Sequence, residues 1–316
     1  MRVYAGSAAI EARLVRPVVT VGSFDGIHLG HRSILETVVE RARAHDGTAT
    51  VVTFEPHPRK VLHPDRPPRL LSTTEQRVEL IEAAGIDVTI LEPFTPEFSR
   101  TPPEQFVRDY LHRRLAPVEV YVGYDFRFGH DREGSMRLLT ELGPRLGFAV
   151  TIVPEVTIEG EDVNSTRIRA LVAEGDAATA GRLLGRPYAL RGRVVSGDRR
   201  GRGLGFPTLN LAPENELLPG NGVYAGRVRF LDDGDPPSGA VFSAVTNVGR
   251  RPTFDAGDRI VCESHLLEFA ADAGGRRIEV SFVDRLRPER RFPSGDALRE
   301  QIARDVDEAR RRLADA

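Results

Sequence analysis

The chain has 316 residues, of which 40% are hydrophobic and 28% are charged, and its formal net charge is −2. This composition is typical of a globular protein with room for two domains, and the small net charge excludes a general attraction to nucleic acid. A single cysteine, Cys262, excludes an intrachain disulfide. With neither an apolar run of about 18 residues nor a secretory segment, the chain is expected in the cytoplasm, with no membrane and no obligate protein partner.

After a short expected strand in residues 1–16, the first candidate binding site is the segment 18–31, VVTVGSFDGIHLGH. Its β-branched valines predict a buried strand, and the residues after the turn predict a helix whose amino terminus suits phosphate. Glycines without a Cβ would let a ligand approach the backbone at Gly22, Gly26 and Gly30. His28 and His31 are three residues apart, so they share a helix face and could stabilise charge during transfer at phosphorus.

The same two histidines have an alternative interpretation as zinc ligands, but the sequence offers no convincing third ligand near them. The next apolar run, 48–54, predicts a second strand, which ends in Glu55-Pro56-His57-Pro58. Because open α/β sheets bind ligands at the carboxyl ends of their strands, His57 would reach the same pocket. A rigid turn without a binding role is the alternative.

Further helices are predicted at 74–84 and 102–115, and further strands at 87–91, 118–122 and 150–153. The strand at 118–122 runs into the loop GYDFRFG, where Asp125, Phe126 and Phe128 suit aromatic stacking and polar recognition. A turn with packed phenylalanines is the alternative. Strands that alternate with helices predict a mostly parallel, Rossmann-like α/β sheet for this half of the chain.

A second candidate phosphate site lies in the segment 164–169, NSTRIR. Ser165 resembles a helix N-cap, and the hydroxyl groups of Ser165 and Thr166 would hold phosphate together with the free amides of a helix start. Arg169 would add a charge-assisted contact. Capping alone would also explain the serine.

The pattern changes near residue 186, where helical periodicity ends and strands follow one another. Strands are predicted at 189–196, 222–230, 240–248, 259–269 and 276–282, before a final helix at 294–313. Strands in series, separated by glycine and proline turns, predict a small antiparallel β-barrel. We therefore expect two domains, 1–186 and 187–316.

The second half carries its own candidate residues. Loop 197–205 is basic and glycine-rich, and it would either cover phosphates or form only a mobile hairpin; its glycines include Gly201, Gly203 and Gly205. In the PTLN that follows, Thr208 and Asn210 would project hard oxygen donors to one side of an extended chain. Such donors suit Mg²⁺ held jointly with nucleotide phosphates.

A general base for this half has two candidates, Glu263 and Glu268. Strand alternation would put them on opposite faces of the strand predicted at 259–269. Both faces are partly apolar, so alternation does not choose between them. Cys262, the neighbour of Glu263, is expected to be a small core residue.

Taken together, these motifs resemble those of a known family. GSFDGIHLGH, FEPHP, GYDFRFG and NSTRIR in the first half, followed by PTLN, NVGRRPTF and ESHLL in the second, are similar in kind and order to the signatures of bacterial bifunctional FAD synthetases. The resemblance covers essentially the whole chain and implies a nucleotidyltransferase domain followed by a riboflavin kinase domain. Such a protein would phosphorylate riboflavin to FMN, releasing ADP, and adenylylate FMN to FAD with a second ATP, releasing pyrophosphate.

The resemblance also implies roles for individual residues. It places the catalytic carboxylate of the kinase at Glu263 and makes His28 and His31 the catalytic pair of the adenylyltransferase. It implies ATP or phosphate binding at Gly22, Phe24, Asp25, Gly26, Gly30, Ser165, Thr166, Arg169, Gly201, Gly203 and Gly205. It implies flavin contacts at His57, Asp125, Phe126, Phe128, Asn247 and Arg251, and Mg²⁺ ligands at Thr208 and Asn210.

The chain departs from the family pattern at two places. Asn164 stands where the second signature usually has a serine, and residues 272–275 read DAGG where the family commonly has D-x-Y-G, which bears on the efficiency of the kinase. Two other functions stay open: an adenylyltransferase whose second half only binds flavin, and a non-catalytic flavin or nucleotide sensor. A sensor would have no need of both H-x-G-H and P-T-x-N together with Glu263.

Overall fold

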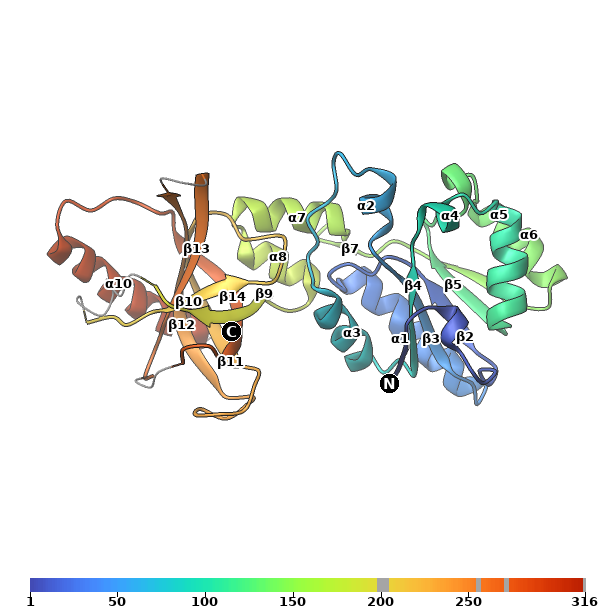
Figure 1. Cartoon of the computed structure of the whole chain (residues 1–316), viewed down its shortest axis with the longest axis horizontal. Helices are drawn as coiled ribbons and strands as arrows, with labels where there is room; N and C mark the ends of the chain where they lie inside the picture. Colours follow the sequence, from blue (N-terminus) through green and yellow to red (C-terminus); the bar gives the residue numbers. More distant parts are fainter. Residues whose placement is uncertain (198–204, 254–256, 270–272, 315–316) are drawn as a thin grey trace. The chain divides into compact units, whose positions relative to one another are not determined.

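The structure is a computed structural model that describes residues 1–197, 205–253, 257–269 and 273–314, without the side chains of 250–253 and 257–260. Its contacts divide the chain into two compact units, Met1–Ser165 and Thr166–Ala316, which run from blue to green and from yellow-green to red in Figure 1. Two helices, α7 (Ser165–Glu174) and α8 (Ala177–Leu184), come after this division, and α8 packs on the strands that follow it. The contacts thus divide the chain at residue 165, ahead of the boundary predicted at residue 186. Whether 1–186 and 187–316 fold independently stays a prediction.

A six-stranded parallel sheet forms the centre of the first unit, in the order β1-β4-β3-β2-β5-β6. Its strands are β1 (Arg2–Tyr4), β2 (Val18–Val21), β3 (Ala49–Glu55), β4 (Val88–Pro93), β5 (Glu119–Gly123) and β6 (Ala149–Val153). The predicted Rossmann-like sheet is confirmed. The strand order reverses at β2, which is where open α/β sheets form their binding crevice.

Helices connect these strands (Figure 1). They are α1 (Leu29–Ala44), α2 (Pro58–Leu62), α3 (Thr74–Ala83), α4 (Pro96–Ser99), α5 (Pro103–Gln105) with the π-helical continuation Phe106–Leu115, and α6 (Met136–Arg145). Single helical turns lie at Ser7–Ala9 and His130–Arg132, and a two-stranded hairpin pairs β7 (Thr157–Ile158) with β8 (Glu161–Asp162). The helix predicted at 102–115 is thus confirmed in position.

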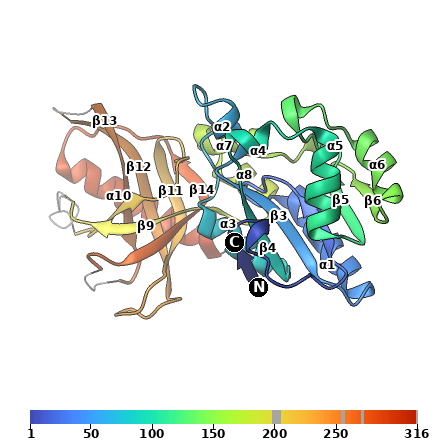
Figure 2. The same cartoon turned by 45° about the vertical axis from the view of Figure 1, so that its right-hand side comes forward.

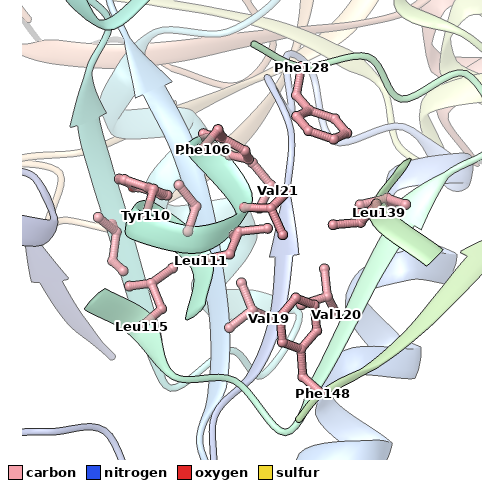
Figure 3. Close-up of a cluster of buried hydrophobic side chains, with 14 of the residues drawn as sticks. Val19, Val21, Phe106, Tyr110, Leu111, Leu115, Val120, Phe128, Leu139 and Phe148 are labelled. Atoms are coloured by element: carbon pink, nitrogen blue, oxygen red, sulfur yellow. The ribbon is translucent and has the colours of Figure 1, made fainter. Parts of the chain in front are cut away.

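Apolar layers cover both faces of the sheet. On one face, Val19, Val21 and Val120 pack against the π-helical segment, from which Phe106 and Leu111 point at the strands (Figure 3). On the other face, α1 lays its buried side chains over the strands, Leu35 and Val38 among them. Burial on both faces explains why the central strands read as continuous apolar runs.

The amino-terminal edge of the same sheet carries an ionic cluster. The carboxylate of Glu119, at the start of β5, accepts hydrogen bonds from Arg41 Nη2 (2.6 Å) and from the Tyr121 hydroxyl (2.8 Å). His45 Nε2 lies 2.7 Å from the same carboxylate. These bonds, led by that of Arg41, lower the pKa of Glu119 to about 2, although burial opposes them.

We expect acid to destabilise the first unit partly through this cluster. Because folding lowers the pKa of Glu119 from 4.5 to about 2, its contribution to stability is complete above 4.5 and is lost as the pH falls toward 2. Since Arg41 is partly exposed, solvent screening makes the loss smaller than the pKa shift alone implies. Thermal unfolding should show Glu119→Gln less stable than the parent near neutral pH, with the difference shrinking in acid. A difference that stays constant with pH would contradict this origin.

The second unit is a closed barrel of six antiparallel strands, in the order β10-β13-β12-β11-β14-β9. The strands are β9 (Tyr188–Val195), β10 (Leu209–Pro213), β11 (Gly222–Phe230), β12 (Val241–Thr253), β13 (Gly257–Leu266) and β14 (Arg277–Arg287). The predicted barrel is confirmed. Several boundaries are wrong: β13 ends at Leu266 instead of 269, β12 at Thr253 instead of 248 and β14 at Arg287 instead of 282, and β10 was not among the predicted strands. Glu268 has a left-handed backbone with φ 62° in the turn beyond β13.

The last helix, α10 (Gly295–Ala314), covers part of the outer wall of this barrel (Figure 2). Its Val306, Ala309 and Leu313 share one apolar cluster with Val223 of β11 and Val245 of β12. An ion pair fixes the helix as well. Asp305, which is 4% exposed, accepts from Arg287 of β14 through Nε (3.0 Å) and Nη2 (2.8 Å). The helix therefore has one fixed position on its barrel.

Candidate active sites

The glycine-rich turn after β2 lies at the carboxyl edge of the sheet, where the strand order reverses. Three of its residues have a left-handed backbone: Phe24 (φ 49°), Gly26 (φ 82°) and Ile27 (φ 40°). Such angles are costly for a phenylalanine and still more for a β-branched isoleucine. Both side chains are buried in the core on the α1 side of the sheet, and this burial offsets the cost.

Neighbouring side chains crowd two of the predicted glycines, Gly26 in the turn and Gly30 at the start of α1. A Cβ on Gly26 would come within 2.7 Å of Leu71, and one on Gly30 within 3.2 Å of the His28 ring. The sequence suggested that a ligand approaches the backbone here. The structure adds that the protein's own chain already packs closely against both positions.

His28 and His31 meet at the amino terminus of α1. His28 is the N-cap of the helix, and its Nδ1 accepts a hydrogen bond from the backbone N–H of His31 (3.3 Å). The two rings stack with their centroids 3.6 Å apart and their planes 19° apart, so the predicted juxtaposition is confirmed. Nδ1 of His28 therefore acts as an acceptor and caps the helix.

Asp25 organises the turn from its centre. Its buried carboxylate accepts from the backbone N–H groups of Leu71 (3.0 Å) and Ser72 (3.2 Å). Its carbonyl oxygen accepts from the hydroxyl of Ser165 (3.0 Å). The side chains of Asp25 and Ser165 thus make contacts within the protein, and a role of either in phosphate binding stays a prediction.

The residues expected to contact flavin in the first unit differ in exposure. His57 is 4% exposed and caps α2, with its Nδ1 accepting from the Arg59 N–H (3.1 Å). Phe128 is buried, as packing alone would require, and Phe126 stacks on it with centroids 5.5 Å apart. Asp125 is exposed and Phe126 is partly exposed, so these two of the three residues predicted in this loop are accessible to a ligand.

In the barrel, three polar side chains form a row across neighbouring strands. Glu263 of β13 pairs directly with Asn210 of β10 on one side and with Asn247 of β12 on the other. Directly paired residues of antiparallel strands project to the same face, with Cβ atoms roughly 5 Å apart. Cys262 and Ser264 on either side of Glu263 are buried inside the barrel. The row therefore lies on the outer wall, where Glu263 is half-buried.

Cys262 is a core residue, as expected. Burial, with the nearby charge of Glu263 as a second cause, raises the pKa of its thiol to about 12. The thiol therefore stays protonated at neutral pH, where only a thiolate would be reactive. Within the part of the chain that the structure describes, no group of three or more His, Cys, Asp or Glu side chains is placed to hold a metal ion.

The segment that precedes β10 is fixed against β13. Nδ1 of His265 donates to the carbonyl oxygen of Pro207 (2.8 Å), and Phe206 contacts the His265 ring edge-on. Thr208 follows directly and leads into β10. Asn210 therefore lies in β10, the strand that pairs with β13 beside Glu263, and Thr208 lies directly before β10.

A pocket of about 520 Å³ opens at the end of β13. It is lined by Gly205–Pro207, by His265–Phe269 and by the α10 residues Ala303, Val306, Asp307 and Arg310. Glu268 belongs to this lining, so the expectation that it faces away from Glu263 on the same strand is wrong. The reason is the left-handed turn after Leu266, which ends the alternation before it reaches Glu268.

Some predicted site residues cannot be placed in either cluster. Gly201 and Gly203 lie outside the described residues, as does the side chain of Arg251. Gly205 is described, and it has a left-handed φ of 86° with open space around it. Thr166 and Arg169 continue α7 and belong by contacts to the second unit.

Sequence reasoning missed three residues that support these sites: Ser72, Arg77 and His265. Ser72 and Arg77 hold the glycine-rich turn, and His265 holds the PTLN segment. The sequence did contain a signal near Ser72 and Arg77. Thr73 and Gln76, which lie between these two residues, form a capping box that fixes the start of α3.

The fold and the two clusters define a nucleotidyltransferase-like domain joined to a riboflavin kinase-like barrel. Comparison with known families agrees: the FAD synthetase family matches residues 11–167, and the riboflavin kinase family matches residues 184–313. A bifunctional riboflavin kinase/FMN adenylyltransferase of Escherichia coli (strain K12) is 38% identical over 288 residues, 91% of this chain and 90% of that protein. One of Bacillus subtilis (strain 168) is 33% identical over 305 residues, 95% and 93% of the two chains. The chain belongs to the family of bifunctional riboflavin kinase/FMN adenylyltransferases.

A solved structure also resembles the whole chain. It is described as a macrolide-efflux protein from Streptococcus pneumoniae, and it aligns with a TM-score of 0.86 and 29% identity over 98% of both chains. Its name differs from those of the curated relatives, although the fold is shared. Among the helices described here, none combines the length and the apolar character needed to cross a membrane.

Proposed function

We propose that the chain carries out the two reactions of its family at the two clusters described above. The observation that carries this proposal is that each unit holds its own set of residues suited to phosphorus chemistry. The first unit has the stacked His28 and His31 at a helix amino terminus. The second has Glu263 paired between two asparagines on the barrel wall. ATP is the shared co-substrate, and riboflavin and FMN are the phosphoryl and adenylyl acceptors.

In the kinase reaction, the 5′-hydroxyl of riboflavin attacks the γ-phosphorus of ATP, and ADP leaves. Glu263 accepts the hydroxyl proton as the new bond forms. The pocket at the end of β13 has the size and the partly apolar lining that suit a flavin ring, with Phe206, Leu267 and Val306 among its walls. A ring held there would lie close to the strand that carries Glu263. Catalysis would otherwise consist of positioning and charge neutralisation.

The donor set beside Glu263 fits a magnesium ion. Thr208 offers a hydroxyl oxygen and Asn210 an amide oxygen, and both are hard donors of the kind Mg²⁺ takes when substrate phosphates complete its shell. When bound, the ion would neutralise charge on the phosphates. The bond of His265 to Pro207 keeps the segment with Thr208 against β13, which favours this arrangement.

In the adenylyltransferase reaction, a phosphate oxygen of FMN attacks the α-phosphorus of a second ATP, and pyrophosphate leaves. Negative charge grows on the oxygens of the α-phosphate in the transition state. The imidazoles of His28 and His31, together with the free amides of the α1 amino terminus, would stabilise that charge. Ser165, Thr166 and Arg169 would hold the other phosphates of ATP, and Asp125 and Phe126 would contact the flavin.

One assay tests the proposal. The protein is incubated with Mg²⁺ and ATP and with either riboflavin or FMN, and the flavins are separated by chromatography. FMN and FAD from riboflavin support both activities. FAD from FMN, with no product from riboflavin, would show an adenylyltransferase whose barrel only binds flavin, and no product from either would indicate a sensor. Omission of Mg²⁺ should abolish both reactions.

We propose that the two reactions need no nucleic acid and no partner protein, and that the protein is located in the cytoplasm.

The kinase should work without the first unit. We expect residues 187–316 to fold and to phosphorylate riboflavin, because the barrel is closed without the first sheet. Residues 166–316 should be the more stable fragment, because they retain α8, whose Leu183 and Leu184 are buried. Circular dichroism and FMN formation check both fragments. A folded fragment that makes no FMN would show that the kinase depends on the first unit.

A further inference from the structure

One short segment of chain, Leu71–Arg77, makes several of the contacts that hold the glycine-rich turn of the first unit. From its start, the backbone N–H of Leu71 and that of Ser72 donate to the Asp25 carboxylate. The Ser72 hydroxyl lies 3.3 Å from the same carboxylate and accepts from the Gly26 N–H (3.2 Å). These contacts fix the middle of the turn, where the backbone is left-handed.

Arg77 reaches the beginning of the same turn from α3. Its Nη1 donates to the carbonyl oxygen of Ser23 (3.2 Å), which also accepts from the Thr53 hydroxyl (3.0 Å). Its Nη2 donates to Glu55 Oε2 (2.6 Å) at the end of β3. The residue is 2% exposed. A guanidinium buried this deeply is stable only when it is paired, and its planar fork can bridge the two partners at once.

The two anchors act on one rigid body. Thr73 caps α3 in a reciprocal capping box with Gln76, so the segment between Ser72 and Arg77 is locked. Ser23 and Gly26 are therefore held at a fixed separation while Phe24 and Ile27 keep strained backbone angles. The turn leads directly into His28 and the amino terminus of α1. Its geometry decides where the two imidazoles and the free amides point.

We propose that Arg77 is a positioning residue for adenylyl transfer, and that it acts by holding Ser23 against the end of β3. Its side chain is 2% exposed, so it would act through the turn and not on the substrate. This inference rests on the proposed adenylyltransferase function of the His28 and His31 site. A displacement of about 1 Å in a reacting group can lower a rate by roughly 10²-fold. Loss of Arg77 should therefore lower turnover much more than substrate affinity.

The test compares Arg77→Met and Arg77→Lys with the control Arg41→Met. Arg41 makes an ion pair of similar length with Glu119 in the same unit, but at the opposite edge of the sheet. For each protein, kcat and KM are measured for FAD formation from FMN, Kd for ATP by calorimetry, and Tm by thermal unfolding. FMN formation from riboflavin is measured in the same samples as the reference for intact protein.

We expect Arg77→Met to lower the kcat of FAD formation by roughly 10²-fold, with Kd for ATP and FMN formation close to those of the parent. Arg77→Lys should recover part of the loss, because one ammonium can reach either Ser23 or Glu55 but does not span both as the fork does. Arg41→Met should lower Tm without changing kcat. Parent-like turnover in Arg77→Met, or an equal loss of turnover in Arg41→Met, would overturn the inference.

Should Arg77→Met not fold, Arg77→Lys makes the same comparison at the same residue, because it keeps one cation but cannot bridge Ser23 and Glu55 at once. A loss of turnover at unchanged ATP affinity supports the inference, and parent-like turnover overturns it. A parent protein that makes no FAD from FMN would refute the proposed adenylyltransferase itself. The two failures are therefore distinguishable.

Discussion

Replacing Glu263 with glutamine should cut FMN formation by roughly 10²–10⁴-fold, the range in which a positioned general base contributes. Glutamine keeps the shape of glutamate and its place between Asn210 and Asn247 in the ladder, but it is a far weaker proton acceptor. Riboflavin affinity should therefore change little. FAD formation from supplied FMN should continue at the parent rate, because that reaction belongs to the other unit.

Glu268→Gln is the matched control for this substitution. Glu268 lines the same pocket but lies in the turn beyond β13 and outside the row of Glu263, so its loss should affect riboflavin affinity more than turnover. Equal losses from both substitutions would point to a folding effect, and a loss confined to Glu268→Gln would refute the assignment of Glu263. Thr208→Ala and Asn210→Ala should weaken the use of ATP with Mg²⁺ in the kinase reaction only.

Replacing His28 and His31 together with alanine should suppress FAD formation from FMN by at least 10²-fold, the usual cost of losing a donor to developing charge. The two rings stack at the amino terminus of α1, so one imidazole could partly substitute for the other in a single variant. FMN formation from riboflavin should stay near the parent rate, and the flavin chromatography reports both products in one run. Parent-like FAD formation in the double variant would refute the assignment of this pair.

A loss of the helix N-cap must be separated from a loss of catalysis in that variant. His28 accepts from the His31 N–H, and removal of an N-cap costs about 1 kcal/mol. His28→Asn is the control, because asparagine restores a capping oxygen without an imidazole. We expect His28→Asn with His31→Ala to recover the parent Tm but not the parent rate of FAD formation.

Local sequence patterns predicted the two architectures well, for physical reasons. Strands of the first sheet are buried on both faces and read as apolar runs, and the glycine-rich turn sits where β2 ends. The spacing predicted that His28 and His31 share a helix face, but His28 is the N-cap with an extended backbone, so the cap geometry brings the two rings together. The row formed by Asn210, Glu263 and Asn247 could be predicted only in part. Strand alternation shows which face of its strand a residue lies on, but it does not show which residue of the neighbouring strand pairs with it. Asn247, for which the family resemblance implied a flavin contact, turns out to pair with Glu263 in the ladder.

Other features depend on contacts between segments that are distant in sequence. The bonds from Leu71 and Ser72 to Asp25 span 46 and 47 residues, and that from Ser165 spans 140. No local pattern reports such partners. The end of β13 was misjudged because an apolar alternation continues through Leu267 and Phe269, while Glu268 adopts a left-handed angle that few glutamates take.

The placement of Glu263 makes its strand sensitive to length. β13 is paired on both sides within a closed barrel, so it cannot slide without breaking two ladders. Deletion of one residue ahead of Glu263 would exchange inside for outside along the strand. The Glu263 carboxylate would then enter the interior opposite Val248, in the place of Cys262, and the small buried side chain of Ser264 would take its place on the wall. An insertion or deletion of one residue in this strand would therefore exchange its two faces, whereas a change of two residues would restore them. Single substitutions leave the faces unchanged.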